Sequence, residues 1–364
     1  MKKTIRLISI FSVNKSSGHS IYDDTFYFDL SKKSNLPFTF YASPYSISQL
    51  TKKCAADNED VSPIFVENKG LITTLRAIMS IPVLRNDRVV FLGYSEKFVS
   101  LFLLFNLFRK YELVIVATNN ICAWRISKYK NRLKVFFLLI NRRLKRFVVH
   151  TEEERRLCQT LSDQLFDKVV LKKHHLMIPR EEKYGGSRVD GKIVAFFGPE
   201  KPGKPVQPMI DLVKNDTELS FDYRFFNVDQ ESVVCKYGLS TFNNVEILNK
   251  WLSKEEYFGE FSNSSLIMMT HDKSFEGKLS GNLCDCISLG VPFISSDIEP
   301  VRSLARRYGP IGYVYDMDKE TWVHSFLEDF SPESYRLCKD NLRKLGEDYE
   351  RSVVEEDNAK VLLQ

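Results

Sequence analysis

Residues 275–297, FEGKLSGNLCDCISLGVPFISSD, decide the fold of this chain. Leu283, Cys286 and Ile287 recur at the i, i+3 and i+4 spacing of an amphipathic helix. Gly290 is placed to end that helix, and a short apolar run then closes on two serines and an aspartate, as in a buried parallel strand. The carboxyl end of such a strand opens into the crevice where doubly wound α/β folds bind ligands. The stretch therefore predicts an α/β fold with a ligand site at this edge of a sheet.

The start of the expected helix has the chemistry of an anion site. Ser280 can cap the helix, and Gly281 lets a ligand approach the first-turn N–H groups, which attract phosphate. Lys278 adds positive charge beside them. Asp285 lies about one turn further along, where a carboxylate accepts hydrogen bonds from sugar hydroxyls, and Glu276 precedes the helix. Together they favour a sugar nucleotide; an ordinary capped helix with a surface lysine and aspartate is the alternative, because such helix starts are common.

The same stretch resembles the donor-binding motif of GT-B glycosyltransferases, above all family 4. In that motif a loop with glutamate leads into a helix and then a strand of the form G-x-P-x-I-x-S-D, which residues 290–297, GVPFISSD, match. The two motif glutamates of the family are eight positions apart. Asp285 stands at the second position, and Glu276 lies one residue before the first.

The resemblance implies a role for each of these residues. Glu276 would be a catalytic-site residue that positions the donor sugar, and Asp285 would hold the ribose. The departing nucleotide would be stabilised by Lys278 and by the amides of Ser280, Gly281 and Asn282.

Two earlier segments also resemble the family's donor site. Residues 198–204, GPEKPGK, are similar to its G-R-x-x-x-x-K-G loop, with Gly198 and Lys204 at the family's spacing and a proline in place of the arginine. Lys204, helped by Lys201, would place a cation on the donor diphosphate. Residues 245–257 are similar to a V-x-f-x-G-x-v-s-x-e-e segment whose backbone would contact the nucleobase, here at Lys250, Trp251 and Leu252.

The length of 364 residues allows two domains, because single hydrophobic cores usually stop growing beyond roughly 250–300 residues. The resemblance implies an α/β GT-B fold, in which two doubly wound Rossmann-like domains face each other across a cleft. We expect an acceptor-binding domain over 1–182, a nucleotide-sugar-binding domain over 183–340, and a C-terminal helix over 341–364 that packs back on the first domain.

The first domain offers a candidate of its own. A strand is expected from residue 5, followed by the loop VNKSSGHS, which contains Gly18 and His19. In GT-B enzymes a glycine-containing loop here faces the donor phosphates or the acceptor, which implies that Gly18 contacts the donor and that His19 is a catalytic candidate near the reacting centre. A loop histidine in solvent is the alternative for His19.

Charge divides unevenly along the chain. Residues 1–182 hold 30 Lys and Arg against 17 Asp and Glu, or +13, whereas residues 183–364 hold 22 against 30, or −8. An acid-free stretch with nine basic residues, in which 125–147 reads as a basic amphipathic helix, predicts contact with a membrane surface. The apolar stripe could instead be core. Nucleic acid is not expected as a partner, because no recognition motif accompanies the charge.

Cysteine usage and hydropathy suggest the compartment. The seven cysteines show no paired metal-ligand spacing, which favours reduced thiols, and no metal site is expected. No stretch approaches the ~20 apolar residues of a membrane span. We therefore expect a cytoplasmic protein, peripheral at the inner face of the cytoplasmic membrane.

Taken together, the resemblance implies a glycosyltransferase that moves a sugar from a nucleotide-diphosphate sugar to a glycan or polyprenyl-linked glycan. The expected setting is bacterial surface polysaccharide synthesis, as for a capsule or exopolysaccharide. Transfer would be retaining and would need neither metal nor other cofactor. Two alternatives stay open at this point, namely an inactive GT-B partner subunit and a GT-B nucleotide-sugar epimerase.

Overall fold

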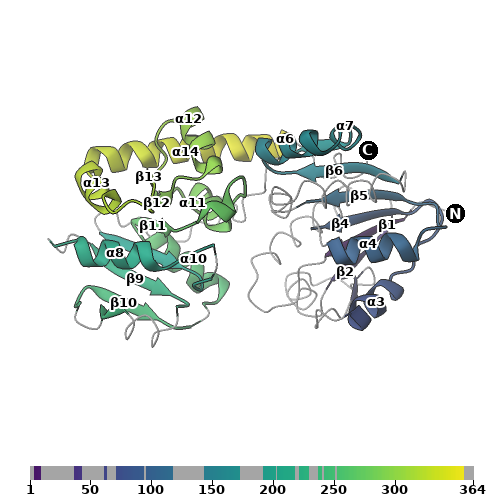
Figure 1. Cartoon of the computed structure of the whole chain (residues 1–364), viewed down its shortest axis with the longest axis horizontal. Helices are drawn as coiled ribbons and strands as arrows, with labels where there is room; N and C mark the ends of the chain where they lie inside the picture. Colours follow the sequence, from purple (N-terminus) through teal and green to yellow (C-terminus); the bar gives the residue numbers. More distant parts are fainter. Residues whose placement is uncertain are drawn as a thin grey trace. The chain divides into compact units, whose positions relative to one another are not determined.

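The computed structural model of the chain divides into two compact units. Unit 1 comprises Met1–His175 and Ser352–Gln364, and unit 2 comprises Leu176–Arg351 (Figure 1). The structure describes residues 4–9, 37–42, 61–63, 71–93, 96–117, 143–172, 192–201, 203–217, 221–228, 237–239, 242–250 and 252–355.

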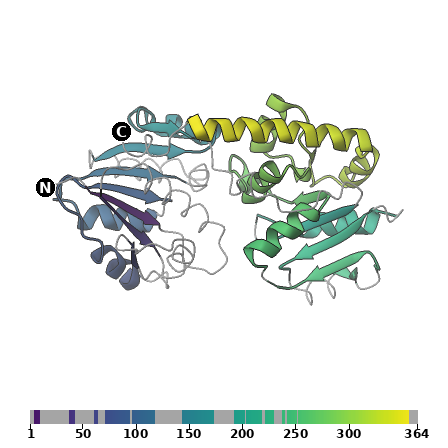
Figure 2. The same cartoon turned by 180° about the vertical axis from the view of Figure 1, so that it is seen from behind.

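Unit 1 is built on a seven-stranded sheet in the order β3-β2-β1-β4-β5-β6-β7. Every neighbouring pair is parallel. Its described strands are β1 (Ile5–Ser9), β2 (Phe38–Ala42), β3 (Val61–Pro63), β4 (Arg88–Leu92), β5 (Glu112–Val116), β6 (Leu144–Val149) and β7 (Val169–Leu171) (Figures 1 and 2).

Unit 2 is built on a six-stranded sheet in the order β10-β9-β8-β11-β12-β13, again with parallel pairs throughout. Its strands are β8 (Ile193–Phe197), β9 (Asp222–Phe226), β10 (Val245–Leu248), β11 (Leu266–Met269), β12 (Phe293–Ser296) and β13 (Tyr313–Tyr315). All residues of β11 and β12 are buried, as expected for strands of a parallel sheet that is covered on both faces.

Both sheets share one topology. In each, the first strand lies between the second strand and the fourth, so the direction of winding reverses beside β1 and beside β8. This order defines a doubly wound Rossmann-like unit. The expectation of two such units is confirmed.

The described helices connect the strands of the two sheets or follow the last strand. Those described in unit 1 are α3 (Leu71–Met79), α4 (Glu96–Phe105), α6 (Glu152–Leu161) and α7 (Asp163–Phe166). The others are α8 (Gln207–Asn215), α10 (Lys254–Asn263), the short 3-10 helix η3 (Lys273–Phe275), α11 (Gly281–Leu289), α12 (Glu299–Tyr308), α13 (Trp322–Asp329) and α14 (Pro332–Glu355). Within the described parts of the chain, no helix is long and apolar enough to cross a membrane.

Local sequence explains where several helices begin and end. Thr151 and Glu154 form a reciprocal capping box at the start of α6, and Ser253 and Glu256 form another at the start of α10. Gly290 ends α11 in the left-handed conformation, at φ 66°, as its position after the periodic residues predicts.

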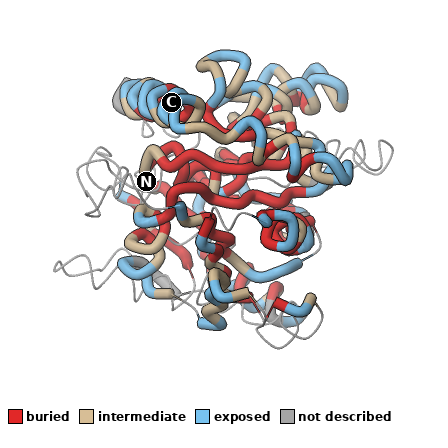
Figure 3. The backbone as a smooth tube through the Cα atoms, turned by 90° about the vertical axis from the view of Figure 1, so that its left-hand side faces the viewer, coloured by how far each residue is buried: buried red, intermediate tan, exposed pale blue. Residues whose placement is uncertain are grey.

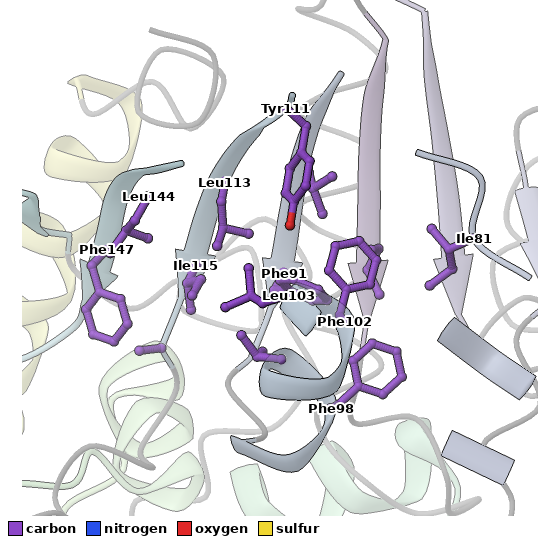
Figure 4. Packing of buried hydrophobic residues seen from close by; sticks show 14 of the residues in the cluster. Ile81, Phe91, Phe98, Phe102, Leu103, Tyr111, Leu113, Ile115, Leu144 and Phe147 are labelled. Carbon is purple, nitrogen blue, oxygen red and sulfur yellow. The ribbon is translucent and has the colours of Figure 1, made fainter. Parts of the chain in front are cut away.

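The core of unit 1 extends along the sheet and under the helices that cover it, and around β4 and α4 it is rich in aromatic side chains (Figure 4). The Phe102 ring meets Phe91 edge-to-face at 5.1 Å and Tyr111 at 6.0 Å, measured between ring centroids. Buried positions follow the strands, whereas exposed positions gather on the outer helices (Figure 3). Phe102 itself is fully buried.

The interpretation of residues 125–147 as one amphipathic helix is wrong at its C-terminal end. β6 begins at Leu144, and both Leu144 and Phe147 are fully buried in the core of unit 1. Pairing with β5 and β7 places this segment inside the sheet, which overrides its helical periodicity. Residues 125–142 lie outside the described residues.

The expected boundary between residues 340 and 341 falls inside α14, which is continuous from Pro332 to Glu355. Leu342, Leu345 and Tyr349 pack in the core of unit 2 with Phe293. These three residues of the expected C-terminal segment therefore contribute to the core of unit 2. The expected boundary at 182/183 lies outside the described residues.

Phe102→Ala should lower the free energy of unfolding of unit 1 by about 3–5 kcal/mol, because it removes a buried ring and leaves a cavity. Phe108→Ala is the matched control, since the Phe108 side chain is 95% exposed. Urea unfolding of the full chain, followed by circular dichroism, measures both. Equal unfolding midpoints for the two variants would contradict the described packing of Phe102.

Candidate functional site

The loops after β8 and β11 meet at the point where the winding of the second sheet reverses. The Asp272 N–H donates to the Gly203 carbonyl at 3.1 Å, and the Thr270 hydroxyl donates to the Pro205 carbonyl. Because all strands of this sheet are parallel, both loops leave from the same edge. These contacts fix the two loops to each other and define the candidate site within unit 2.

Lys204 is the buried cation of this site. Its side chain returns to the end of β8, where the ammonium donates to the Phe197 carbonyl and lies 5.1 Å from the centre of the Phe196 ring. Gly198, the next residue after β8, has φ 108° and must stay small, because a Cβ there would lie 3.1 Å from Lys204 Nζ. Gly198 and Lys204, which have the family's spacing in the sequence, therefore also lie close together in space.

The charge of Lys204 is costly in this position. Burial, and then the nearby charge of Lys201, lower the pKa of Lys204 to about 8. The two lysines are joined by a tight turn, in which the Lys204 N–H donates to the Lys201 carbonyl at 2.8 Å. Among the described residues, no carboxylate lies within ion-pair distance of Lys204. A bound anion would relieve this cost.

The N-terminus of α11 lies beside the same carbonyl. The Asn282 side-chain amide donates to the Phe197 oxygen at 3.4 Å, so Asn282 and Lys204 converge on one atom. Ser280 is the N-cap but makes no side-chain capping bond, and a Cβ on Gly281 would meet no atom within 4 Å. The first turn of α11, whose N–H groups lack partners within the helix, thus lies close to a buried cation, and its Gly281 borders open space.

His271 joins the site although the sequence interpretation did not select it. It follows β11 directly, is 4% exposed, and packs its ring 4.4 Å from that of Phe275. Burial, together with the charges of Lys204 and Lys201, lowers its pKa to about 3, so the imidazole is neutral at physiological pH. Its position at the carboxyl end of an expected strand was the feature that could have identified it.

Lys278 lies against the Phe275 ring. Its ammonium is 5.1 Å from the centre of that ring, and its N–H donates to the Phe275 carbonyl at 2.8 Å. Phe275 therefore links Lys278 to His271. Lys278 is half-buried, in the loop that leads into α11.

Asp285 lies one turn inside α11 and is buried. The Tyr257 hydroxyl of α10 donates to Asp285 Oδ2 at 2.8 Å, while Oδ1 has no hydrogen-bond partner among the described residues. Burial raises the pKa of Asp285 to about 7, opposed by the Tyr257 hydrogen bond. Tyr257 also packs edge-to-face on Phe197 at 5.2 Å, which connects Asp285 to the end of β8.

Glu276 is held by α12. Arg302 forms an ion pair with its carboxylate at 2.5 Å, and the Glu299 N–H donates to it at 3.3 Å. Arg302 also binds Asp297, directly after β12, at 2.9 Å. The carboxylate thus sits at the N-terminus of α12, where a negative charge is stabilised by the helix dipole.

Two of the remaining candidates are described, and both follow β10. Lys250 follows β10, two strands away from β8, and pairs with Glu256 at 3.0 Å. Leu252 packs against the core of unit 2. Gly18, His19 and Trp251 lie outside the described residues.

The site brings together Gly198, Lys201, Lys204, Asn282 and the start of α11, with His271 and Lys278 in the adjoining loop. Cations, backbone donors and a neutral imidazole form a site for an anion with further hydrogen-bonding groups. Within the described ranges, no group of three or more His, Cys, Asp or Glu side chains is arranged to hold a metal ion.

Comparison of the structure with solved structures establishes the fold as GT-B. HepE of Anabaena, solved in complex with UDP and glucose, matches with a TM-score of 0.69 at 11% identity, covering 98% of both chains. Sucrose-phosphate synthase of Thermosynechococcus elongatus matches at 0.67 and 10% identity, covering 97% of both chains. UDP-GlcNAc 2-epimerase of Neisseria meningitidis, bound to UDP-GlcNAc, matches at 0.58 and 14%, covering 97% of this chain and 98% of that one.

The sequence alone yields no such match. No protein-family model matches the chain, and no curated protein is similar to it in sequence. The solved structures that share its architecture include both glycosyltransferases and nucleotide-sugar epimerases, and at these identities they show the fold alone.

Gly198→Ala should destabilise unit 2 by about 1–3 kcal/mol, because a side chain at φ 108° is strained and would press on Lys204 Nζ. The control is Gly259→Ala in α10, where a Cβ meets no atom within 4 Å and alanine favours the helix. Chemical unfolding of both full-length variants measures the difference. An equally stable Gly198→Ala protein would contradict the close contact.

Proposed function

We propose that this protein is a glycosyltransferase that transfers a sugar from a nucleoside diphosphate sugar to a glycan or lipid-linked glycan. The observation that carries the proposal is the convergence of Lys204 and Asn282 on the Phe197 carbonyl, beside the open first turn of α11, in a GT-B fold. A buried cation next to free backbone donors fits a diphosphate.

In the proposed reaction these groups act on the leaving group. Lys204, Lys278 and the amides of Ser280 and Gly281 neutralise the charge that develops on the nucleoside diphosphate as the glycosidic bond breaks. Helix N–H groups and lysines neutralise the leaving diphosphate, which a metal ion does in other glycosyltransferases, so we propose that transfer needs no metal. From the resemblance to family 4 we also propose retention of configuration. His271, which is neutral, donates a hydrogen bond to the bound donor and adds no further positive charge to the site.

The nucleoside and the sugar are assigned to the neighbouring groups. Asp285, with its unpaired Oδ1, holds the ribose, and the nucleobase lies against the backbone of Lys250, Trp251 and Leu252. Glu276 positions the donor sugar, and His19 with Gly18 contributes from the first domain.

The proposal also covers the pathway and the place in the cell where the acceptor is used. We assign the reaction to bacterial surface polysaccharide synthesis at the inner face of the cytoplasmic membrane. Basic residues of 125–147 contribute to contact with that membrane, except for the segment that forms β6, whose apolar residues are buried.

A second candidate is an inactive partner subunit with the same fold. The specific observation in its favour is the ion pair between Glu276 and Arg302, which engages the carboxylate that would otherwise meet the donor sugar. Such a protein would bind a nucleotide and show no turnover with any acceptor. A nucleotide-sugar epimerase would instead interconvert the donor in the absence of acceptor.

The first test is a thermal-shift panel with UDP, GDP, ADP, CMP and their sugars. One diphosphate should stabilise the protein selectively, by about 2.7 kcal/mol at a hundred-fold excess over Kd. Lys204→Met should abolish that shift, whereas Lys214→Met, an exposed lysine of α8, should preserve it. A folded wild-type protein that responds to none of these ligands would refute the donor site.

The affinity for the selected diphosphate should fall between pH 7 and pH 9. The pKa of Lys204 lies at about 8 in the free protein, and a bound anion raises it, so deprotonation above pH 8 weakens binding by up to about tenfold per pH unit. Phosphate groups are already ionised in this range. Lys204→Arg keeps its charge and should bind equally at both pH values in isothermal titration. A fall of the same size in Lys204→Arg would place the titrating group elsewhere.

A further inference from the structure

Exposed apolar side chains of unit 1 gather on one surface formed by α3, α4 and the turns that follow them. Of the nine large apolar residues that are exposed in the described part of the chain, seven lie between residues 72 and 108. Phe108 is 95% exposed, Met79 73% and Leu104 63%. The two helices lie side by side (Figure 1). We call this region the α3–α4 surface.

The helices that form this surface carry large apolar residues on their outer faces as well as on their inner faces. Ile78 of α3 and Phe102 of α4 point into the core of unit 1. A helix on the surface of a soluble domain usually carries polar residues opposite its buried face. Here Met79 and Leu104 occupy exposed positions on the same helices. A patch of this kind marks a contact with a partner or a membrane.

A hollow of about 900 Å3 lies within the α3–α4 surface. Its wall combines the apolar residues Pro82, Leu84 and Phe105 with the basic residues Arg85 and Lys110. The Arg109 guanidinium donates to the Val83 carbonyl at 2.8 Å and so fixes the turn after α4 to the turn after α3. The surface is therefore a structured feature rather than a frayed end.

Among the described residues, the exposed charges in the turns after α3 and α4 are positive, whereas the nearby Asp87 is buried against Arg6 and Glu112 pairs with Arg88. Residues 71–86 and 97–111 contain no aspartate or glutamate. Arg76, Arg85 and Lys110 are exposed, and none of the three forms an ion pair with another described residue. Protein interfaces usually combine an apolar centre with a mixed polar rim. An apolar patch whose exposed charges, among the described residues, are cations matches the interfacial region and headgroups of an anionic bilayer.

We infer that the α3–α4 surface binds anionic lipid membranes. Phe108 and Leu104 insert among the lipid chains, while Arg85 and Lys110 reach the phosphate headgroups with their aliphatic stems against the apolar boundary. This surface is separate from residues 125–147. The inference rests on the proposed function, in which the acceptor is carried by a membrane, and it deepens that function by naming the surface that meets the membrane. Membrane binding itself can be measured without catalysis.

The test is co-flotation of the full-length protein with vesicles of phosphatidylglycerol and phosphatidylcholine, compared with vesicles of phosphatidylcholine alone. We expect binding to the anionic vesicles only. Phe108→Ser should lower partitioning by about tenfold or more. Leu337→Ser is the matched control, since Leu337 is 50% exposed on α14 in unit 2, and it should bind as the wild type does.

The electrostatic contribution to vesicle binding is tested with two double variants. Arg85→Gln combined with Lys110→Gln should weaken binding by about tenfold or more, and added salt should reduce the wild-type affinity. Lys214→Gln combined with Lys344→Gln removes the same charge from exposed positions of unit 2 and should have no effect.

Three outcomes would overturn the inference: a wild-type protein that ignores anionic vesicles, equal binding of Phe108→Ser and Leu337→Ser, or a dimer in lipid-free solution that Phe108→Ser dissociates. The last result would assign the surface to a second copy of the chain. The nucleotide thermal shift, measured on the same variants, separates the two proposals. Vesicle binding without a nucleotide shift would refute only the donor site, and the reverse would refute only the membrane surface.

Discussion

The candidate site depends on one constraint, which is that every strand of the second sheet runs in the same direction. The carboxyl ends of β8 and β11 therefore lie at one edge, and the reversal of winding beside β8 leaves room between the loops that follow them. Lys204 returns to the Phe197 carbonyl because Gly198 turns the chain through a conformation that a larger residue would resist. An antiparallel neighbour in place of β11 would move His271 and the start of α11 to the other edge.

The electrostatics of the site follow from this placement. Removing Lys204 from water is unfavourable, and its lowered pKa reflects that cost. Burial, and then the charges of Lys204 and Lys201, lower the pKa of His271 and keep it neutral, whereas burial raises the pKa of Asp285. Groups with opposite shifts, placed close to one sheet edge, are typical of sites where a ligand completes the charge balance.

The two units carry different surfaces. Unit 2 holds the cluster of Lys201, Lys204 and Lys278 near its sheet edge, although residues 183–364 are acidic as a whole. The described part of unit 1 presents the α3–α4 surface, where apolar side chains and unpaired cations occur together. Local arrangement rather than net charge therefore defines each surface, because screening limits the reach of exposed charges to about 10 Å.

The sequence by itself determined the helix and the strand within residues 275–297 and, through the resemblance, the doubly wound class, because period and glycine position are local properties. The closeness of Gly198 to Lys204 came from the tertiary structure. The sequence could not reveal that Leu144 belongs to a central strand, since partners distant in the sequence decided that. Tertiary structure alone brought Arg302 to Glu276 and His271 to Lys204. It also buried Phe102, which faces the core of unit 1 from α4, and exposed Phe108, which lies in the turn after that helix. The apolar character of a residue does not by itself determine whether the fold buries it or leaves it exposed to water.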